Sequence, residues 1–274
     1  MIRLPRPVTT GLPLVAAQMA DAPAGPLLVA GAQYAGVGRA TPWHRHARGQ
    51  LLGATQGLLA LETGQGKWVV PANGAIWIPP GMPHGLQSHG PFAGWSVYVR
   101  PDACLGLPAQ VGMFRASGLL REAILRAAQW SLPAGPESVL DAVQQRLAAV
   151  ILDEMAGLPA APLGLPMPQQ APLLNIARAL LAQPGDERSM AQWAHWAGIA
   201  PRSLTRHFTR ETGYSFAAWR QRLRLLCALE MLAAGRGVTA IASELGYAST
   251  STFIAVFKRS FGTTPGRYLE AAPT

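Results

Sequence analysis

Two histidines one residue apart, followed by a glutamine, stand in the stretch TPWHRHARGQ at residues 41–50. Successive side chains of a β-strand point to opposite faces, so His44 and His46 project the same way in an extended segment, and Gln50 joins them if no bulge intervenes. Two imidazoles on one face can bind a transition metal. The stretch therefore predicts a site for a metal or a small ligand.

The spacing around these residues resembles the first sequence motif of the cupins. Five residues separate Gly38 from His44, and six separate Gln50 from Gly57. A second cupin-like motif follows in GAIWIPPGMPHGLQS, where His84 takes the place of the third histidine and Ser88 stands where asparagine is often found. The resemblance implies a small β-barrel whose mouth holds the histidines, the usual place for a small ligand.

Gln50 stands where cupins usually carry a glutamate, and an amide is a poorer metal ligand than a carboxylate. Sites made of three histidines nevertheless exist. Three interpretations stay open: a divalent metal bound by His44, His46 and His84, an effector pocket without metal, or a purely structural cluster. The residues expected in the pocket are His44, His46, Gln50, His84 and Trp77.

Two arginines lie in the same stretch as the paired histidines. Arg45 and Arg48 could contact an anionic effector, and exposed positions at the rim of the barrel explain them equally well. The nearest acidic residue beyond the first motif is Glu62, five residues past Gly57, so no substitute carboxylate is evident.

The segment from Leu27 to Val99 consists of short apolar runs separated by Gly, Pro and Asn. This texture is typical of short antiparallel strands in a barrel or sandwich. Between Phe114 and Gly157 the apolar period becomes helical, and Pro136 and Gly157 stand where a helix would begin and end. Its apolar stripe could pack within its own domain or form a helix pair in a homodimer, and it runs over Val139, Leu140, Val143, Leu147, Val150, Ile151 and Met155.

Residues 158–172 (LPAAPLGLPMPQQAP) contain five prolines in fifteen positions. Proline prevents a helix and favours an extended, semi-rigid connection. The segment is therefore the best candidate for a linker between domains.

The last third of the chain contains an internal repeat. When residues 204–219 are placed over 253–268 at an offset of 49, Leu204 meets Phe253, Phe208 meets Phe257, Gly213 meets Gly262 and Trp219 meets Tyr268. A short amphipathic helix ending at a glycine precedes each copy, MAQWAHWAGI before the first and VTAIASELGY before the second. Helix, glycine turn and second helix are the helix-turn-helix pattern, in which the second helix enters the major groove of DNA.

In the first unit Leu204 and Phe208 should face the core, which leaves the polar residues on other faces. Arginine can read guanine edges and can also neutralise phosphate, so Arg206 and Arg202 are the best candidates to read bases. The full set of candidates here is Arg202, Ser203, Thr205, Arg206 and Arg210.

The second unit is chemically different, because hydroxyl residues open its recognition helix. Hydroxyl and backbone N–H groups at a helix N-terminus suit phosphate, and one of the residues, Ser249, should be the N-cap. The candidates for DNA binding are Ser249, Thr250, Ser251, Thr252, Lys258 and Arg259.

The stretches WAGIAPRSLTRHFTRETGYSFAAWRQRLRL and IASELGYASTSTFIAVFKRSFGTTPGRYL resemble the two helix-turn-helix units of the AraC/XylS transcription regulators, over roughly residues 172–270. The resemblance implies a long helix, about Phe216 to Ala234, that holds both recognition helices about 34 Å apart on one face of DNA. Family base contacts would fall on Arg202, Thr205 and Arg206, and on Thr250, Ser251 and Ile254 or Ala255. Ala255 departs from members that carry arginine there.

Charge and composition agree with a polyanion partner. The formal net charge is +9, and residues 171–274 hold 12 basic and 6 acidic side chains. No run of eighteen apolar residues occurs, and Pro5, Pro7 and Pro13 interrupt the N-terminus, so we expect a soluble, cytoplasmic protein. The only two cysteines in the sequence, Cys104 and Cys227, lie in different halves of the chain and lack metal-type spacing, so we expect neither a disulfide framework nor a zinc finger.

The expected fold class is α+β multidomain. It comprises a cupin-like, effector-sensing β-barrel at 1–110, a helical linker and dimerisation segment at 111–165, and an all-α domain with two helix-turn-helix units at 166–274. We expect a bacterial transcription regulator, not an enzyme, that binds promoter DNA, a small-molecule effector, RNA polymerase and a second copy of itself. A divalent metal is the candidate cofactor. The alternative is a cupin metalloenzyme, a dioxygenase or isomerase, with an appended helical domain.

Overall fold

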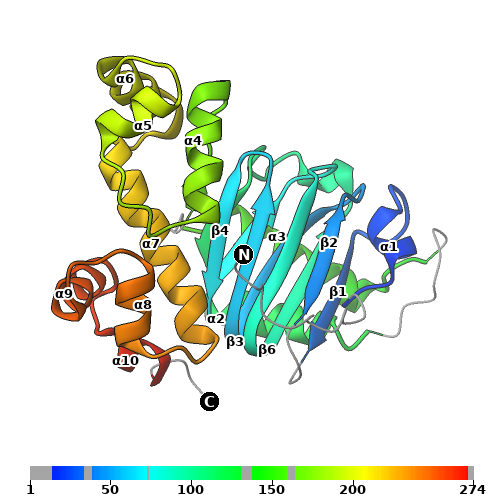
Figure 1. Ribbon diagram of the computed structural model, residues 1–274. Coiled ribbons are helices and arrows are strands. Elements are labelled where there is room, and N and C mark those ends of the chain that lie inside the picture. Colours follow the sequence, from blue (N-terminus) through cyan, green and yellow to red (C-terminus); the bar gives the residue numbers. More distant parts are fainter. Residues whose placement is uncertain (1–13, 34–38, 73, 131–137, 160–163, 271–274) are drawn as a thin grey trace. The chain divides into compact units, whose positions relative to one another are not determined.

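The computed structural model describes residues 14–33, 39–72, 74–130, 138–159 and 164–270 (Figure 1). These residues divide into two compact units. The first contains residues 14–63 and 70–159, and the second contains residues 64–69 and 164–270. Within the described residues, no helix is long and apolar enough to cross a membrane.

The first unit is rich in antiparallel strands, as the apolar runs between Leu27 and Val99 predict. The strand β6 (His84–Val99) pairs with β1 (Leu28–Gln33), β2 (Ala40–His44) and β3 (Gly49–Thr63). The strand β5 (Gly74–Ile78) pairs with β3 and with β7 (Gly112–Arg115). In Figure 1 these strands form a curved sheet, and a short helix, α1 (Ala17–Asp21), precedes β1.

The two faces of this sheet have different environments. On one face Leu51, Trp95 and Val97 form an apolar core with Leu120 and Ile151 of the helices α2 (Gly118–Ala127) and α3 (Ala142–Ala156). Neighbouring residues of the same strands point to the opposite face because side chains alternate along a strand. That opposite face lines a cavity. Alternate residues of the same strands therefore contribute to the apolar core and to the cavity.

The helical segment begins later than its periodicity suggests. Phe114 lies in β7, and the predicted helix start at Pro136 lies outside the described residues. The helix α3 begins after Asp141, which caps it in a capping box with Gln144, and it ends at Gly157 as predicted. A 3₁₀ turn at Pro101–Cys104 precedes β7.

The apolar stripe of the α3 segment is divided between core and solvent. Ile151 and Met155 are buried, whereas Val139, Val143 and Val150 are exposed by 77%, 66% and 39%. The periodicity identifies the stripe, but the sheet and α2 cover only one flank of it. Its other flank is an apolar surface of the first unit.

The proline-rich linker is partly a strand. Residues Gly164–Pro166 form β8, which pairs with Gly66–Trp68 of β4 (Gly66–Pro71). These paired residues belong to the second unit. The next helix, α4 (Ala171–Ala182), carries a proline in its first turn, where the missing N–H has no intrahelical partner to lose.

The second unit otherwise consists of helices. After α4 come α5 (Met190–Trp196), α6 (Pro201–Thr212), α7 (Phe216–Ala233), α8 (Val238–Glu244), α9 (Thr250–Phe261) and α10 (Pro265–Glu270). The long helix predicted from Phe216 to Ala234 is therefore confirmed. Its buried residues include Trp219, whose ring lies 5.4 Å from that of Phe208 in α6, centroid to centroid.

Candidate nucleic-acid interface and effector cavity

The first helix-turn-helix unit is α5, a glycine turn and α6. Ser189 begins α5 in a capping box with Gln192, and Gly198 adopts a left-handed φ of 67° in the turn. The helix α6 ends at Gly213, which has a φ of 74°. Glycine adopts this conformation without the steric penalty that a side chain brings, so the two glycines fix where each helix stops.

The core face and the polar face of α6 are separated as predicted. Leu204 and Phe208 are fully buried, and Arg202, Thr205, Arg206 and Arg210 are exposed. Ser203 is half-buried. Because the four exposed side chains project from one side of the helix, they can approach a single groove of DNA.

Sequence reasoning missed two further polar residues on α6. Thr209 is exposed and lies on the same side as Arg202 and Arg206. His207 stands between two arginines, with its Nε2 3.1 Å from Nη2 of Arg206 and its Nδ1 3.2 Å from Nη2 of Arg210. The helical spacing of the sequence could have identified Thr209, because it lies seven residues after Arg202.

The second unit repeats this architecture with different surface chemistry. Gly246 and Gly262 have φ values of 68° and 76°, and Phe253 and Phe257 are fully buried. Ser249 is the N-cap, as predicted, and its Oγ accepts a hydrogen bond from the backbone N–H of Thr252. Ser251, Thr252, Lys258 and Arg259 are exposed, and Thr250 is half-buried.

The two tryptophans of α5 have different environments. Trp193 is fully buried, with the guanidinium carbon of Arg188 3.7 Å from the centre of its ring, whereas Trp196 is 51% exposed. Trp196 is thus mainly a surface residue, and His195 beside it is also exposed.

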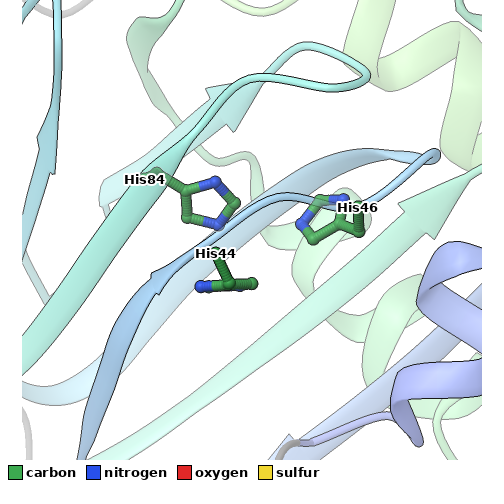
Figure 2. A group of neighbouring side chains, drawn as sticks. All are labelled: His44, His46 and His84. Atoms are coloured by element: carbon green, nitrogen blue, oxygen red, sulfur yellow. The ribbon is translucent and has the colours of Figure 1, made fainter.

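In the first unit, the three histidines converge although they come from two separate sequence motifs (Figure 2). His84 lies directly opposite His44 in the ladder between β2 and β6. The ring centroids are 4.3 Å apart for His44 and His84 and 5.1 Å apart for His46 and His84. One ligand nitrogen from each residue lies within 4.8 Å of the other two.

Each imidazole is oriented by a backbone carbonyl. Nδ1 of His44 donates to the carbonyl of Pro42, that of His46 to Arg48, and that of His84 to Met82, over 2.6–2.8 Å. A neutral ring that donates through Nδ1 keeps a lone pair on Nε2. The arrangement therefore presents three Nε2 atoms as acceptors, and Nε2 of His84 is buried with no hydrogen-bond partner in the part of the chain that the structure describes.

Gln50 is held beside this cluster by two hydroxyl residues. Its Nε2 donates to Oγ of Ser96 over 2.8 Å and to the phenol oxygen of Tyr98 over 3.0 Å. Its Oε1 lies 3.1 Å from Nε2 of His46. With the amide in this orientation, two acceptors face each other, Oε1 of Gln50 and the lone pair on Nε2 of His46. The contact becomes favourable if a cation binds between them, or if the amide rotates so that its NH₂ group faces the ring.

Burial sets the protonation of the site. It lowers the pKa of His46, and it lowers that of His84 to about 4, although the carbonyl that each ring faces acts in the opposite direction. Burial also raises the pKa of Tyr98. At neutral pH the two buried rings are therefore uncharged, which is the form that binds a metal.

The cavity has a volume of about 180 Å³ and a mixed wall. His44, His46, Gln50, Ser96 and Tyr98 supply its polar side. Its apolar lining includes Leu52, Leu59, Leu86 and Phe92, while Arg39 and Asp21 are its charged members. Sequence reasoning missed Arg39, Ser96 and Tyr98, because no motif marks them.

Four expectations about this region are wrong. His84 is not among the residues that line the cavity, although its ring lies beside that of His44. Trp77 does not line the cavity: it belongs to the core on the opposite face of the sheet, where its Nε1 donates to the carbonyl of Pro108. Arg48 is fully buried and donates to the carbonyls of Ala22, Ala24 and Pro26, so it does not contact an effector. His46 lies beyond the end of β2, in the connection to β3, rather than in a continuous strand.

Comparisons with known families cover nearly the whole described chain. The family described as AraC-like ligand binding domain matches residues 29–191, and the family described as helix-turn-helix domain matches residues 193–271. The second match spans both repeats.

Named relatives are similar over different lengths. The HTH-type transcriptional regulator NimR of Escherichia coli (strain K12) is 33% identical over 234 residues, which are 85% of this chain and 84% of NimR. The HTH-type transcriptional regulator RipA of Corynebacterium glutamicum is 35% identical over 104 residues, 38% of this chain and 31% of RipA. Among solved structures, the DNA-binding domain of AdpA in complex with a target DNA is 25% identical, with a TM-score of 0.35, over 36% of this chain and 91% of that domain.

Proposed function

Because the chain belongs to the AraC family of transcription regulators, we propose that α6 and α9 read promoter DNA in two successive major grooves while a small-molecule effector occupies the cavity of the first unit. The observation that carries this proposal is the repeat. The equivalent residues Leu204 and Phe253, and Phe208 and Phe257, are all fully buried. Each recognition helix therefore keeps a polar face free for DNA.

The helices α6 and α9 make different kinds of contact with DNA. Arg202, Thr205 and Arg206 read base edges from α6, supported by Ser203 and Arg210, because arginine pairs bidentately with guanine. The helix α9 carries Ala255 where α6 has Arg206, so it contributes chiefly phosphate and shape contacts. These contacts come from Ser249, Thr250, Ser251, Thr252, Lys258 and Arg259.

Footprinting of the full chain on the DNA that flanks its own gene tests this proposal. Two protected major-groove patches about one helical turn apart are expected, on one face of the duplex. Protection that does not favour any site over the rest of the fragment contradicts it.

The effector changes regulation only if it binds two arrangements of the protein with different affinity. The cavity supports effector binding because it combines an apolar wall with a few convergent polar groups, the usual composition of a small-molecule site. The regulator then changes its occupancy of the promoter or its contact with RNA polymerase, and it acts where the chromosome is, in the cytoplasm.

A divalent metal is a second proposed occupant of this unit. Three Nε2 lone pairs converge, and that of His84 is buried with no partner among the described residues. In a tetrahedral zinc site, nitrogens about 2.0–2.1 Å from the metal lie ~3.4 Å apart, so small rotations would bring the three rings around one ion. When bound, such a metal would supply a Lewis acid that can contact an effector; His44, His46 and His84 would hold it, with Gln50 Oε1 adjacent.

The same cluster is the observation in favour of a cupin metalloenzyme. This alternative accounts only for the first unit, and it leaves the two helix-turn-helix repeats without a role. The named relatives of this chain are transcriptional regulators, which favours a sensing rather than a catalytic use of the histidines.

We propose that a second copy of the chain covers the exposed flank of α3. Val143 and Val150 are seven residues apart, so they lie on one side of the helix with half-buried Leu147 between them. A two-fold axis at the centre of an antiparallel helix pair would place Val143 of each copy near Val150 of the other. A dimer would also present two DNA-binding units to one promoter.

A further inference from the structure

Arg39 is a buried arginine whose guanidinium interacts electrostatically with Tyr98 but has no anionic partner among the described residues. The residue is 7% exposed, and Nη1 is fully buried with no hydrogen-bond partner among the described residues. The part of the chain that the structure describes provides no hydrogen bond and no ion pair to this guanidinium. A buried charge without a partner is strongly unfavourable, and arginine remains protonated even when burial lowers its pKa.

Arg48 shows how this same unit satisfies a buried arginine that serves structure. Its Nε, Nη1 and Nη2 donate to the carbonyls of Ala22, Pro26 and Ala24 over 2.7–2.9 Å. Arg39 makes no such bonds to the described residues, although both arginines lie within one short stretch of the chain. This difference is the reason to seek the partner of Arg39 in a bound ligand.

The backbone of Arg39 is held in place. Its N–H donates to Oγ of Ser88 over 2.6 Å, and its carbonyl accepts from the N–H of Ser88 over 2.7 Å. The side chain therefore projects from a fixed point into the cavity that it lines. A preorganised arginine in a water-poor site pairs strongly with a planar anion, because its parallel N–H groups match a carboxylate.

The apolar lining and the volume of the cavity indicate the size and polarity of the uncharged part of the ligand. Leu52, Leu59 and Phe92 are almost fully buried and line the same cavity as Arg39. The volume of about 180 Å³ equals roughly six water molecules at about 30 Å³ each. It suits an aromatic or short aliphatic group of about ten non-hydrogen atoms.

We propose that the effector is a small apolar carboxylate, or a similar planar anion, whose charged group pairs with Arg39. This inference rests on the proposed function, which places the effector in this cavity. Asp21 also lines the cavity, but it is exposed and makes no ion pair with Arg39, so it does not substitute for the anion.

Titration calorimetry on the full chain tests the charge preference. Benzoate and octanoate are the probes, and benzamide and octanamide are their uncharged counterparts. We expect each acid to bind at least about tenfold more tightly than its amide, and Arg39→Gln to abolish this difference while leaving amide binding within about twofold. Arg45→Gln, which changes an exposed arginine in the same segment, should keep the wild-type preference.

Two results would overturn the inference. One is that the amides bind as tightly as the acids, or that neither acid binds at millimolar concentration. The other is that Arg39→Gln retains the preference for the acids.

A ligand-free measurement provides an independent check. Because an unpaired buried charge destabilises the fold, Arg39→Met should raise the Tm of the chain without ligand, and a lowered Tm would show that Arg39 has a structural partner. Binding of the same preparations to the DNA upstream of the gene, measured without any probe, shows separately whether the proposed function holds.

Discussion

His44 and His84 face each other across the β2–β6 ladder, with ring centroids 4.3 Å apart, although forty residues separate them in the sequence. The register between β2 and β6 therefore brings together histidines from two motifs that are distant in the sequence. The carbonyls of Pro42 and Met82 orient the two rings so that both Nε2 atoms remain available.

Metal binding should depend on the register between β2 and β6, because that register brings His44 and His84 together. Elemental analysis of protein purified without chelator or a nickel column should find about one divalent transition metal per chain, and His84→Ala should remove it. His195→Ala, which changes an exposed histidine of α5, should leave the metal content unchanged. Metal-free wild-type protein that also fails to take up added zinc would contradict the metal proposal.

Replacing the amide beside the cluster should strengthen metal binding. Gln50→Glu supplies an anionic oxygen at the position of Oε1, 3.1 Å from Nε2 of His46, so zinc affinity should rise by about an order of magnitude. Competition with a chromogenic chelator measures the change. The control is Gln56→Glu, an exposed position of the same strand; an equal effect of both substitutions would indicate general charge attraction instead of ligation.

The parts of the molecule that depend on local sequence could be predicted. The helix-turn-helix units follow from a helical period, a glycine and a cap, all of which act within a few residues, and Gly198, Gly213 and Ser249 have the roles that these signals predict. The two buried phenylalanines of α9 also follow from the repeat.

The parts that depend on distant packing could not be predicted. The backbone of Arg39 is held by Ser88 of the distant strand β6, and Trp77 lines the core because strand parity places it on the face opposite Gln50. The sequence of α3 contains the whole apolar stripe, but only the packed sheet determines that Val143 remains exposed. His46 reaches the cluster from a connection whose end is fixed by the buried Arg48.

The exposed valines of α3 should support a dimer. Val143→Glu should shift the full chain toward monomer in sedimentation velocity, because the charge would be buried in an apolar helix pair. Gln145→Glu adds the same charge on an exposed position outside the valine stripe and should leave the association unchanged. Equal sedimentation of all three proteins would place the interface elsewhere.

The turn after the first recognition helix should require glycine. Gly213 has a φ of 74°, so Gly213→Ala should destabilise the second unit by about 1 kcal/mol, measured by urea unfolding with far-UV circular dichroism. Gly266→Ala is the matched control, since that residue lies in α10 with open space around it, and alanine there should be neutral or stabilising. If Gly213→Ala has no effect, the turn does not limit the stability of the unit.

Base-reading and phosphate-binding residues should differ in how they change DNA binding. Arg206→Ala should lower affinity for the specific site by about 1–3 kcal/mol and reduce the preference for that site over random DNA. Lys258→Ala should weaken binding to the specific site and to random DNA by the same factor. It should also reduce the slope of log affinity against log salt concentration by about one. Identical behaviour of the two variants would contradict the division between α6 and α9.

The most direct test of the central claim is the affinity of the full chain for the DNA upstream of its own gene, compared with a scrambled duplex of equal length and measured across several salt concentrations. A transcription regulator that reads bases should retain a preference of about 10³-fold or more at physiological salt, because base contacts persist when phosphate contacts are screened. Equal affinity for both duplexes at every salt concentration would contradict the account.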